Sequence, residues 1–100
     1  MQKWRYGYLY ELEVVRVGES FPRHFIVAES QGSRLLDQSS LLTSLDALGS
    51  EGWIISQNER LAAKMLSDDS WLVEYIRPKI RSFTHINFTG QYFMRGPCDF

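Results

Sequence analysis

The chain has 100 residues, of which 44% are hydrophobic and 14% aromatic, and its formal net charge at pH 7 is −1. This length predicts one domain, and this composition argues against intrinsic disorder. The near-neutral charge gives no general attraction to nucleic acid or to anionic membranes. A single cysteine excludes an internal disulfide and fits a reducing compartment. Residues 1–5 lead into no apolar signal segment, and no apolar run approaches the ~20 residues of a membrane-spanning helix, so we expect a cytoplasmic protein without membrane contact.

The first expected element is a long strand over residues 4–14, where apolar and polar side chains alternate. One face of this strand is aromatic, with Trp4, Tyr6, Tyr8 and Tyr10. We expect that face to lie in the core under the helix described next, with its outer end forming a cleft or an interface because tyrosine hydroxyls need partners. A turn and a second strand over residues 24–29 follow.

The clearest local pattern is a helix that ends in two glycines and leads directly into a strand. Leucines at positions 41, 42, 45 and 48 form a stripe with helical spacing. Gly49 can take the left-handed conformation that ends a helix, and Gly52 gives a second permissive position before Trp53. Because so short a connection brings the strand back against its helix, we predict that Leu48 and Trp53 share one core and that the strand continues to residue 57.

The second half of the chain is less regular. Residues 58–69 can be helix or loop, and apolar side chains at helical spacing favour one or two helical turns that Asp68-Asp69 ends. A fourth strand is expected from Trp71 to Arg77, ended by Pro78. Together the elements predict an α+β two-layer sandwich, with a four-stranded antiparallel sheet in ββαββ order and one main helix on one face. We place this domain at residues 1–78, and a strand-like C-terminal extension at residues 79–100, packed on the domain or on a partner subunit.

The segment Leu48-Gly49-Ser50-Glu51-Gly52-Trp53 resembles the signature of a small bacterial and phage family, the domain of unknown function 4177. The opening Trp4-Arg5-Tyr6 and the segment Tyr75-Ile76-Arg77-Pro78 are similar to the first and last strands of that family. The resemblance implies a strand–strand–helix–strand–strand domain, allows an origin in a phage or other mobile element, and implies no activity. The chain departs from the family at Ile54, where the family usually has a polar residue, and residues 79–100 lie outside the pattern.

Side chains that could support catalysis or metal binding form no recognisable group. Cys98 with His85 or His24 is the one conceivable nucleophile pair, but a cysteine so close to the C-terminus is poorly placed to be held as an activated thiolate. The histidines and the cysteine lack metal-ligand spacing, and Asp68-Asp69 is typical of a turn. We therefore expect a non-enzymatic protein with no catalytic residue, no cofactor site and no metal ligand.

A protein-interaction or self-association surface is the first class of binding site that the sequence favours. Ile54 points away from Trp53 on its strand, and residues 82–94 carry no charged side chain although they are rich in apolar ones. Such a β-prone stretch is expected to be covered, since left in water it would promote aggregation. We predict a homodimer or larger homo-oligomer, or a complex with an unidentified protein, with candidate interface residues Ile54, Phe83, Ile86, Phe88, Tyr92 and Phe93.

Binding of a small ligand or of single-stranded nucleic acid is the second class. Arg77, Lys79 and Arg81 alternate along an extended segment beside aromatic residues, and the aromatic strand could stack bases. The same charge row is typical of a solvated edge strand, and the slightly acidic chain does not favour nucleic acid. The sequence therefore ranks the interaction module first and leaves its partner unidentified.

Overall fold

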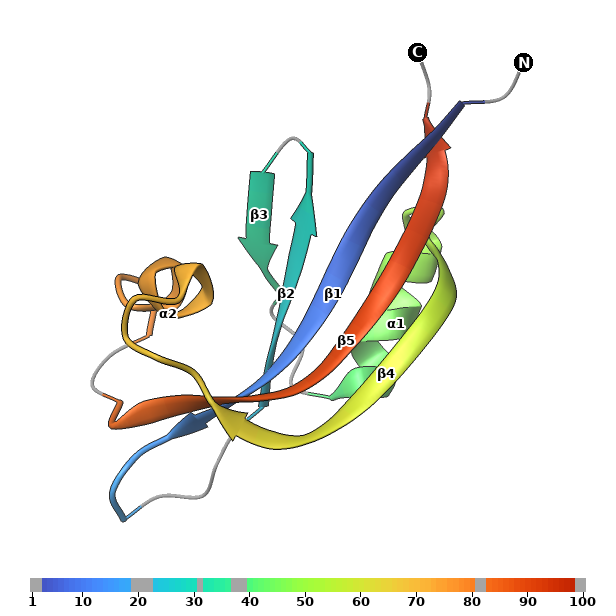
Figure 1. The fold of residues 1–100 in the computed structure, drawn as a ribbon. Coiled ribbons are helices and arrows are strands. Elements are labelled where there is room, and N and C mark those ends of the chain that lie inside the picture. The colour runs from blue at the N-terminus through green and yellow to red at the C-terminus, as the bar shows by residue number, and fades with distance from the viewer. Residues whose placement is uncertain (1–2, 19–22, 31, 37–39, 81–82, 99–100) are drawn as a thin grey trace.

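The computed structural model describes residues 3–18, 23–30, 32–36, 40–80 and 83–98, with their side chains except those of residues 57–63 and 98. This part of the chain contains, in order, β1 (Lys3–Val15), β2 (Arg23–Glu29), β3 (Gly32–Leu35), α1 (Leu41–Ser50), β4 (Ile54–Met65), α2 (Trp71–Ile76) and β5 (His85–Cys98). The strands form one antiparallel sheet in the order β3-β2-β1-β5-β4 (Figure 1). The expected α+β class is confirmed, but the four-stranded ββαββ arrangement with one helix is corrected to five strands and two helices.

The segment expected as a fourth strand, residues 71–77, forms α2 instead. Leu72, Val73 and Ile76 are spaced i, i+1 and i+4, and all three are buried on one side of the helix. Glu74 lies on the other side and is exposed. A short run of apolar residues fits a strand as well as a helical turn, and here packing on the sheet decides for the helix. The segment matched to the family's closing strand therefore lies at the end of α2.

Residues 58–65, expected as helical turns or loop, continue β4. This strand pairs with β5 from Ile54 opposite Arg95 to Met65 opposite Asn87. Its register shifts after Ile55 and again between Arg60 and Lys64. These irregularities interrupt the alternation of a regular strand, which explains why the sequence did not indicate one.

The described part of the expected C-terminal extension is an inner strand of the sheet. β5 pairs with β1 along its whole length, from Cys98 opposite Lys3 to His85 opposite Val15, and with β4 on its other side. The order of the strands joins β4 to the rest of the sheet only through β5. An inner strand is covered by neighbours on both edges, which accounts for the uncharged sequence of residues 85–94.

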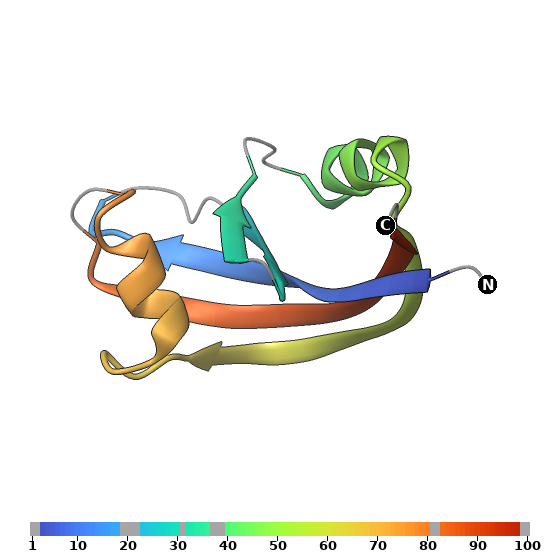
Figure 2. The same ribbon diagram turned by 90° about the horizontal axis from the view of Figure 1, so that it is seen from above.

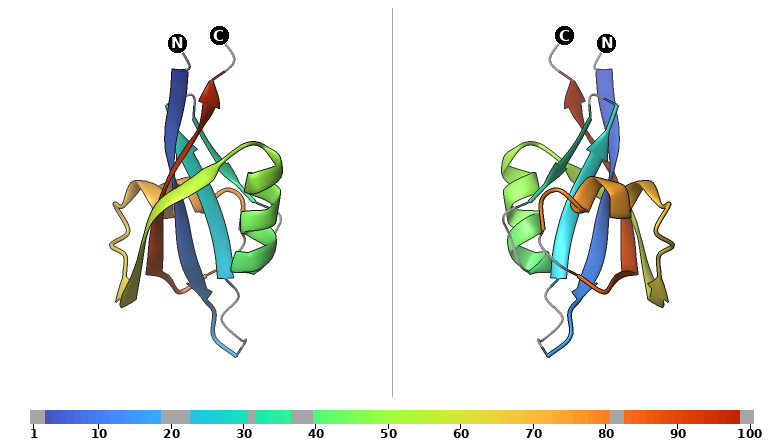
Figure 3. Two further views of the ribbon diagram at one scale, coloured as in Figure 1. Left: turned by 90° about the vertical axis from the view of Figure 1, so that its right-hand side faces the viewer. Right: turned by 90° about the vertical axis from the view of Figure 1, so that its left-hand side faces the viewer.

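Two separate cores lie on opposite faces of the sheet. α1 covers a cluster on the face of Leu9, consisting of Leu9, Phe25, Val27, Leu48, Trp53, Tyr92 and Met94. α2 covers a cluster on the face of Leu12, consisting of Leu12, Val14, Ile26, Leu72, Val73, Ile76, Ile80 and Ile86. Figures 2 and 3 show the two helices on opposite sides and near opposite ends of the sheet. Part of each face is therefore left without a helix.

Trp53 fixes which face of the sheet α1 covers. Its indole lies between two strand glycines: a Cβ on Gly7 would lie 3.3 Å from the ring, and one on Gly96 would lie 3.4 Å from it. Both glycines are on the face opposite to the tyrosines of β1. The expectation that the aromatic face of the first strand lies under the leucine stripe is therefore wrong, because the indole needs the space that the glycine face provides.

The connection from α1 to β4 is a Schellman motif. The Trp53 and Glu51 amides donate to the Leu48 carbonyl, and the Gly52 amide donates to the Gly49 carbonyl. Gly52 takes the left-handed conformation, with φ of 91°. Gly49, expected to be the left-handed residue, instead lies inside the helix. Leu48 and Trp53 lie in the same buried cluster, 1% and 5% exposed.

Candidate functional site

On the face of the sheet opposite α1, the part that α2 leaves uncovered carries a row of aromatic rings. We call this surface the aromatic face, and it consists of Trp4, Tyr6, Tyr8, Tyr10, Ile54, Trp71 and Phe93. The ring centroids of Tyr6 and Phe93 are 5.8 Å apart, and those of Phe93 and Tyr8 are 5.3 Å apart. The row continues from Tyr8 to Tyr10 over 5.8 Å and from Tyr10 to Trp71 over 5.7 Å. These distances are within the range of favourable ring–ring contact.

Strand geometry and register bring these side chains together. Alternate residues of β1 point to one side, which places its aromatic residues in a row. Phe93 of β5 lies opposite Tyr8, and Arg95 lies opposite both Tyr6 on β1 and Ile54 on β4. Directly opposed residues of an antiparallel pair share a face, so Ile54 and Phe93 join the row from two further strands.

The aromatic face is largely exposed to solvent. Trp4 is 36% exposed, Tyr6 53%, Tyr8 37%, Ile54 49% and Trp71 46%. α2 covers only the far end of this face, and Trp71 on that helix marks the boundary. Contiguous apolar surface of this kind on a small protein is typical of a binding site.

Polar side chains also lie on the aromatic face, since Arg95 is opposite Tyr6 and Gln91 is opposite Tyr10. The Arg95 guanidinium lies over the Trp4 ring, 4.8 Å from its centroid, and is exposed. Burial and the neighbouring Tyr8 raise the pKa of Tyr10, so this hydroxyl stays protonated at neutral pH. Among the side chains that the structure describes, Arg95 is the charged group that stacks on a ring of this face.

The six interface residues expected from the sequence separate into two groups. Ile54 and Phe93 belong to the aromatic face. Ile86 and Tyr92 are buried inside the two cores of the chain itself, 0% and 4% exposed, and so they are not available to a partner. Phe83 and Phe88 are half-buried against the α2 core. The side chains of Ile86 and Tyr92 pack into the two cores because β5 is an inner strand whose faces are covered in part by α1 and α2.

The expected basic row does not form beside the aromatic strand. Arg77 follows α2 and stacks on Phe83 at 5.7 Å, and Lys79 lies over the Tyr75 ring at 3.9 Å. Side chains two residues apart point to the same side only in an extended strand, whereas Arg77 and Lys79 follow directly after α2. Arg81 lies outside the described residues.

The side chains considered for catalysis are far apart. Cys98 pairs with Lys3 at one end of β1, whereas His85 pairs with Val15 at the other end and His24 pairs with Leu12. Val15 is twelve steps along the strand from Lys3, a distance of about 40 Å at ~3.3 Å per residue. Within the described residues, no three His, Cys, Asp or Glu side chains are grouped to hold a metal ion.

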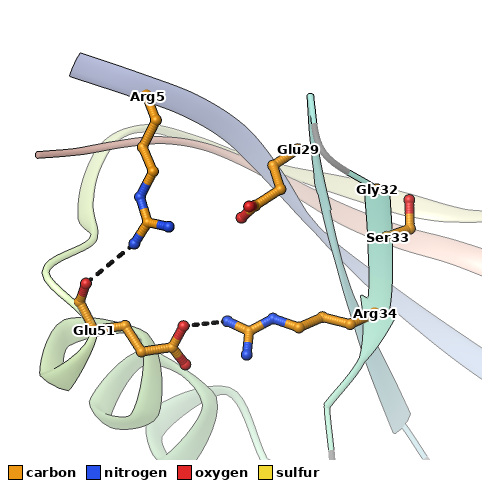
Figure 4. A pocket seen from close by; sticks show the side chains of 6 residues that line it. All are labelled: Arg5, Glu29, Gly32, Ser33, Arg34 and Glu51. Carbon is orange, nitrogen blue, oxygen red and sulfur yellow. Dashed lines mark hydrogen bonds and ion pairs between the residues drawn. The ribbon is translucent and has the colours of Figure 1, made fainter. Parts of the chain in front are cut away.

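A pocket on the other face of the sheet is the second candidate site. It has a volume of about 380 Å³ and is lined by Arg5, Glu29, Gly32, Ser33, Arg34 and Glu51 (Figure 4). We call it the Arg5 pocket. Its walls come from β1, β2, β3 and the end of α1, so residues 46 positions apart in sequence meet there. No local pattern indicates such a site, although a charged Arg5 on the same strand face as the buried Leu9 is an unusual feature.

Arg5 is held in place by two contacts. Its guanidinium carbon lies 4.3 Å from the centroid of the Trp53 indole, and one Nη donates to the Glu51 carbonyl oxygen at 3.2 Å. On the opposite wall, Arg34 forms an ion pair with the Glu51 carboxylate. Figure 4 shows the Arg5 and Glu29 side chains pointing into the same space.

No family model, no curated protein and no solved structure matches this chain. The helices in the described part of the chain are also too short to cross a membrane.

Proposed function

We propose that the protein is a non-enzymatic interaction module that binds a second copy of itself through the aromatic face. The observation that carries this proposal is the row of ring contacts from Tyr6 to Trp71, whose outer surface is exposed. A monomer gains little from leaving such rings in water, and burying them is favourable in proportion to their area.

The size of this surface fits the centre of a dimer interface. If a full aromatic side chain offers roughly 150–250 Å², the five exposed residues present on the order of 400 Å². A standard interface buries roughly 800 Å² on each partner, with an apolar centre and a polar rim. The aromatic face would supply that centre, and the tyrosine hydroxyls and Arg95 would supply part of the rim.

A twofold arrangement is the simplest closed assembly for such a surface. In an isologous dimer the same patch meets itself, so no second complementary surface is required. The row of rings lies along the sheet, and two sheets can pack face to face about 10 Å apart. Arg95 at one end of the row would then lie away from its copy at the other end.

Single-stranded nucleic acid is the second candidate for the same face. Arg95 stacked on Trp4 is the observation that favours it, because bases stack on exposed rings next to cations. Against it, Arg77 and Lys79 stack on rings outside the aromatic face and provide no track for a phosphate backbone. We therefore rank self-association first.

Light scattering after size-exclusion chromatography at micromolar concentration tests the proposal. We expect wild type to have twice the mass of one chain, and Ile54→Glu and Tyr6→Glu to have the mass of one. Leu42→Glu is the matched control, since Leu42 is 75% exposed on α1 at the opposite face and should remain dimeric. A monomeric wild type that instead retains a fluorescent oligo-dT would favour the nucleic-acid candidate.

We also propose that the chain is a divergent member of the domain of unknown function 4177 family and acts in the cytoplasm. The sequence from Leu48 to Trp53 and the short connection that it forms support the family relationship. The single cysteine, and helices too short to span a membrane in the described part of the chain, support the location. A phage or other mobile element as its source stays an expectation from the same resemblance.

A further inference from the structure

We propose that the Arg5 pocket binds a small zwitterion that carries one carboxylate and one ammonium group, such as a free α-amino acid. This site lies on the opposite face of the sheet from the aromatic face and does not depend on self-association. Its volume of about 380 Å³ is near the lower end of the roughly 300–1,000 Å³ that ligand pockets have, which favours a small ligand.

The positive half of the site is Arg5. The Trp53 indole below it and the Glu51 carbonyl beside it fix the plane of the guanidinium. Gly96 has no side chain, so the β5 backbone leaves room for Arg5 Nε, which a Cβ there would approach to 3.4 Å. Among the described residues, Arg5 has no carboxylate partner. A guanidinium held rigidly with free N–H donors is well suited to bind a carboxylate.

The negative half of the site is Glu29. It lies on β2 opposite Gly7, two residues along β1 from Arg5 on the same face. No ion pair or hydrogen bond of its carboxylate is found within the described part of the chain. The side chains of Arg5 and Glu29 enter the pocket from neighbouring strands, as Figure 4 shows. An ammonium group of a ligand could therefore reach Glu29 while its carboxylate contacts Arg5.

The remaining charges of the pocket cancel each other. Arg34 and Glu51 form an ion pair across the wall, which leaves Arg5 and Glu29 as the two charges available to a ligand. A phosphate or dicarboxylate would place negative charge near Glu29, and a polyamine would place positive charge near Arg5. Two like charges inside one small pocket repel each other, and this repulsion weakens binding. The pocket therefore selects a ligand with one charge of each sign.

A titration followed by amide chemical shifts tests this proposal on the full chain. The probes are the twenty common L-amino acids, each at up to 10 mM, with propionate and ethylamine as matched compounds that carry one charge only. We expect at least one amino acid to shift the amides of Gly32, Ser33 and Arg34. The matched compounds should bind at least tenfold more weakly, because each leaves one charge of the pocket without a partner.

Two variants and a control complete the experiment. Glu29→Gln keeps the shape of the side chain but removes its charge, and it should lower the affinity for the amino acid at least tenfold. Arg5→Lys should lower the affinity to the same extent, because it removes the planar donor group. Glu74→Gln, on the exposed side of α2, should not change the affinity. The proposal is overturned if no amino acid shifts these amides, if propionate or ethylamine binds equally well, or if Glu29→Gln binds like wild type. The last result would show that the Glu29 carboxylate does not contact the ammonium group of the ligand.

Discussion

Trp53 is the residue on which the α1 side of the molecule depends most. Its indole is buried among side chains of three strands and one helix, and two strand glycines provide the space for it. We expect Trp53→Ala to reduce the free energy of unfolding by about 3–5 kcal/mol, because the cavity cannot close against a rigid sheet. Urea denaturation measures this loss. Leu42→Ala, at an exposed position on α1, is the control and should change stability little.

The two glycines of the connection after α1 should respond in opposite directions to alanine. Gly49 lies inside the helix with open space around its Cβ position, so Gly49→Ala should stabilise the protein by about 0.5–1 kcal/mol. Gly52 has φ of 91°, and its Cβ would lie 3.2 Å from Pro97, so Gly52→Ala should destabilise it. Thermal melts of both variants show whether Gly52 is the left-handed residue, as in the structure, or Gly49, as the sequence predicted.

His24 should make the folded state less stable in mild acid. Burial, followed by the positive charge of Arg16, lowers the pKa of His24 below its ordinary value of 6.5. The unfolded chain therefore takes up this proton first as pH falls, which favours unfolding below about pH 6.5. We expect the stability of wild type relative to His24→Gln to fall between pH 7.5 and 5.5. Equal pH dependence of the two proteins in urea titrations would contradict this.

Secondary structure that depends on local pattern was predictable, and strand pairing was not. The alternation of β1 and the Leu48-to-Trp53 connection are encoded by neighbouring residues, so the sequence indicates both. α2 and the second half of β4 are decided by what they pack against or pair with, and their short apolar runs fit several structures. For the aromatic face, the sequence suggested Ile54 and Phe93 as interface residues and the outer end of the aromatic strand as a cleft or interface. The Arg5 pocket was not, since four separate elements form it.

The position of β5 predicts that the chain cannot be shortened at residue 81. Because β5 lies between β1 and β4, removing it leaves β1 with an open edge and β4 with no partner strand. We expect a chain ending at Arg81 to lack the far-ultraviolet circular dichroism of the sheet and to aggregate. A folded, soluble truncated chain would show that β5 is an accessory strand. The oligomeric state is therefore better tested by single substitutions on the aromatic face than by truncation.

The two surfaces proposed to bind a second copy and an amino acid lie on opposite faces of one sheet. Each helix covers a core at one end, and each leaves a different surface open: an apolar one formed by rings, and a polar one formed by paired and unpaired charges. Binding at one surface need not involve the other, because the sheet separates them. The substitutions that test self-association should therefore leave amino-acid binding unchanged, and those in the Arg5 pocket should leave the mass of the assembly unchanged.

Self-association through the aromatic face also predicts that thermal stability depends on protein concentration. A dimer that forms from folded chains is stabilised by mass action, whereas a monomer is not. A tenfold rise in concentration contributes about 1.4 kcal/mol per dimer, or half of that per chain, which for a domain of this size raises the melting temperature by on the order of 4 °C.

Wild type and Leu42→Glu should both show this rise between 5 and 50 μM, concentrations on the order of those used for light scattering. Ile54→Glu should melt at one temperature throughout, because a charge added within the aromatic face opposes its burial. A wild-type melting temperature that does not change with concentration would contradict dimer formation in this range, and the exposed rings would then have to serve a different partner.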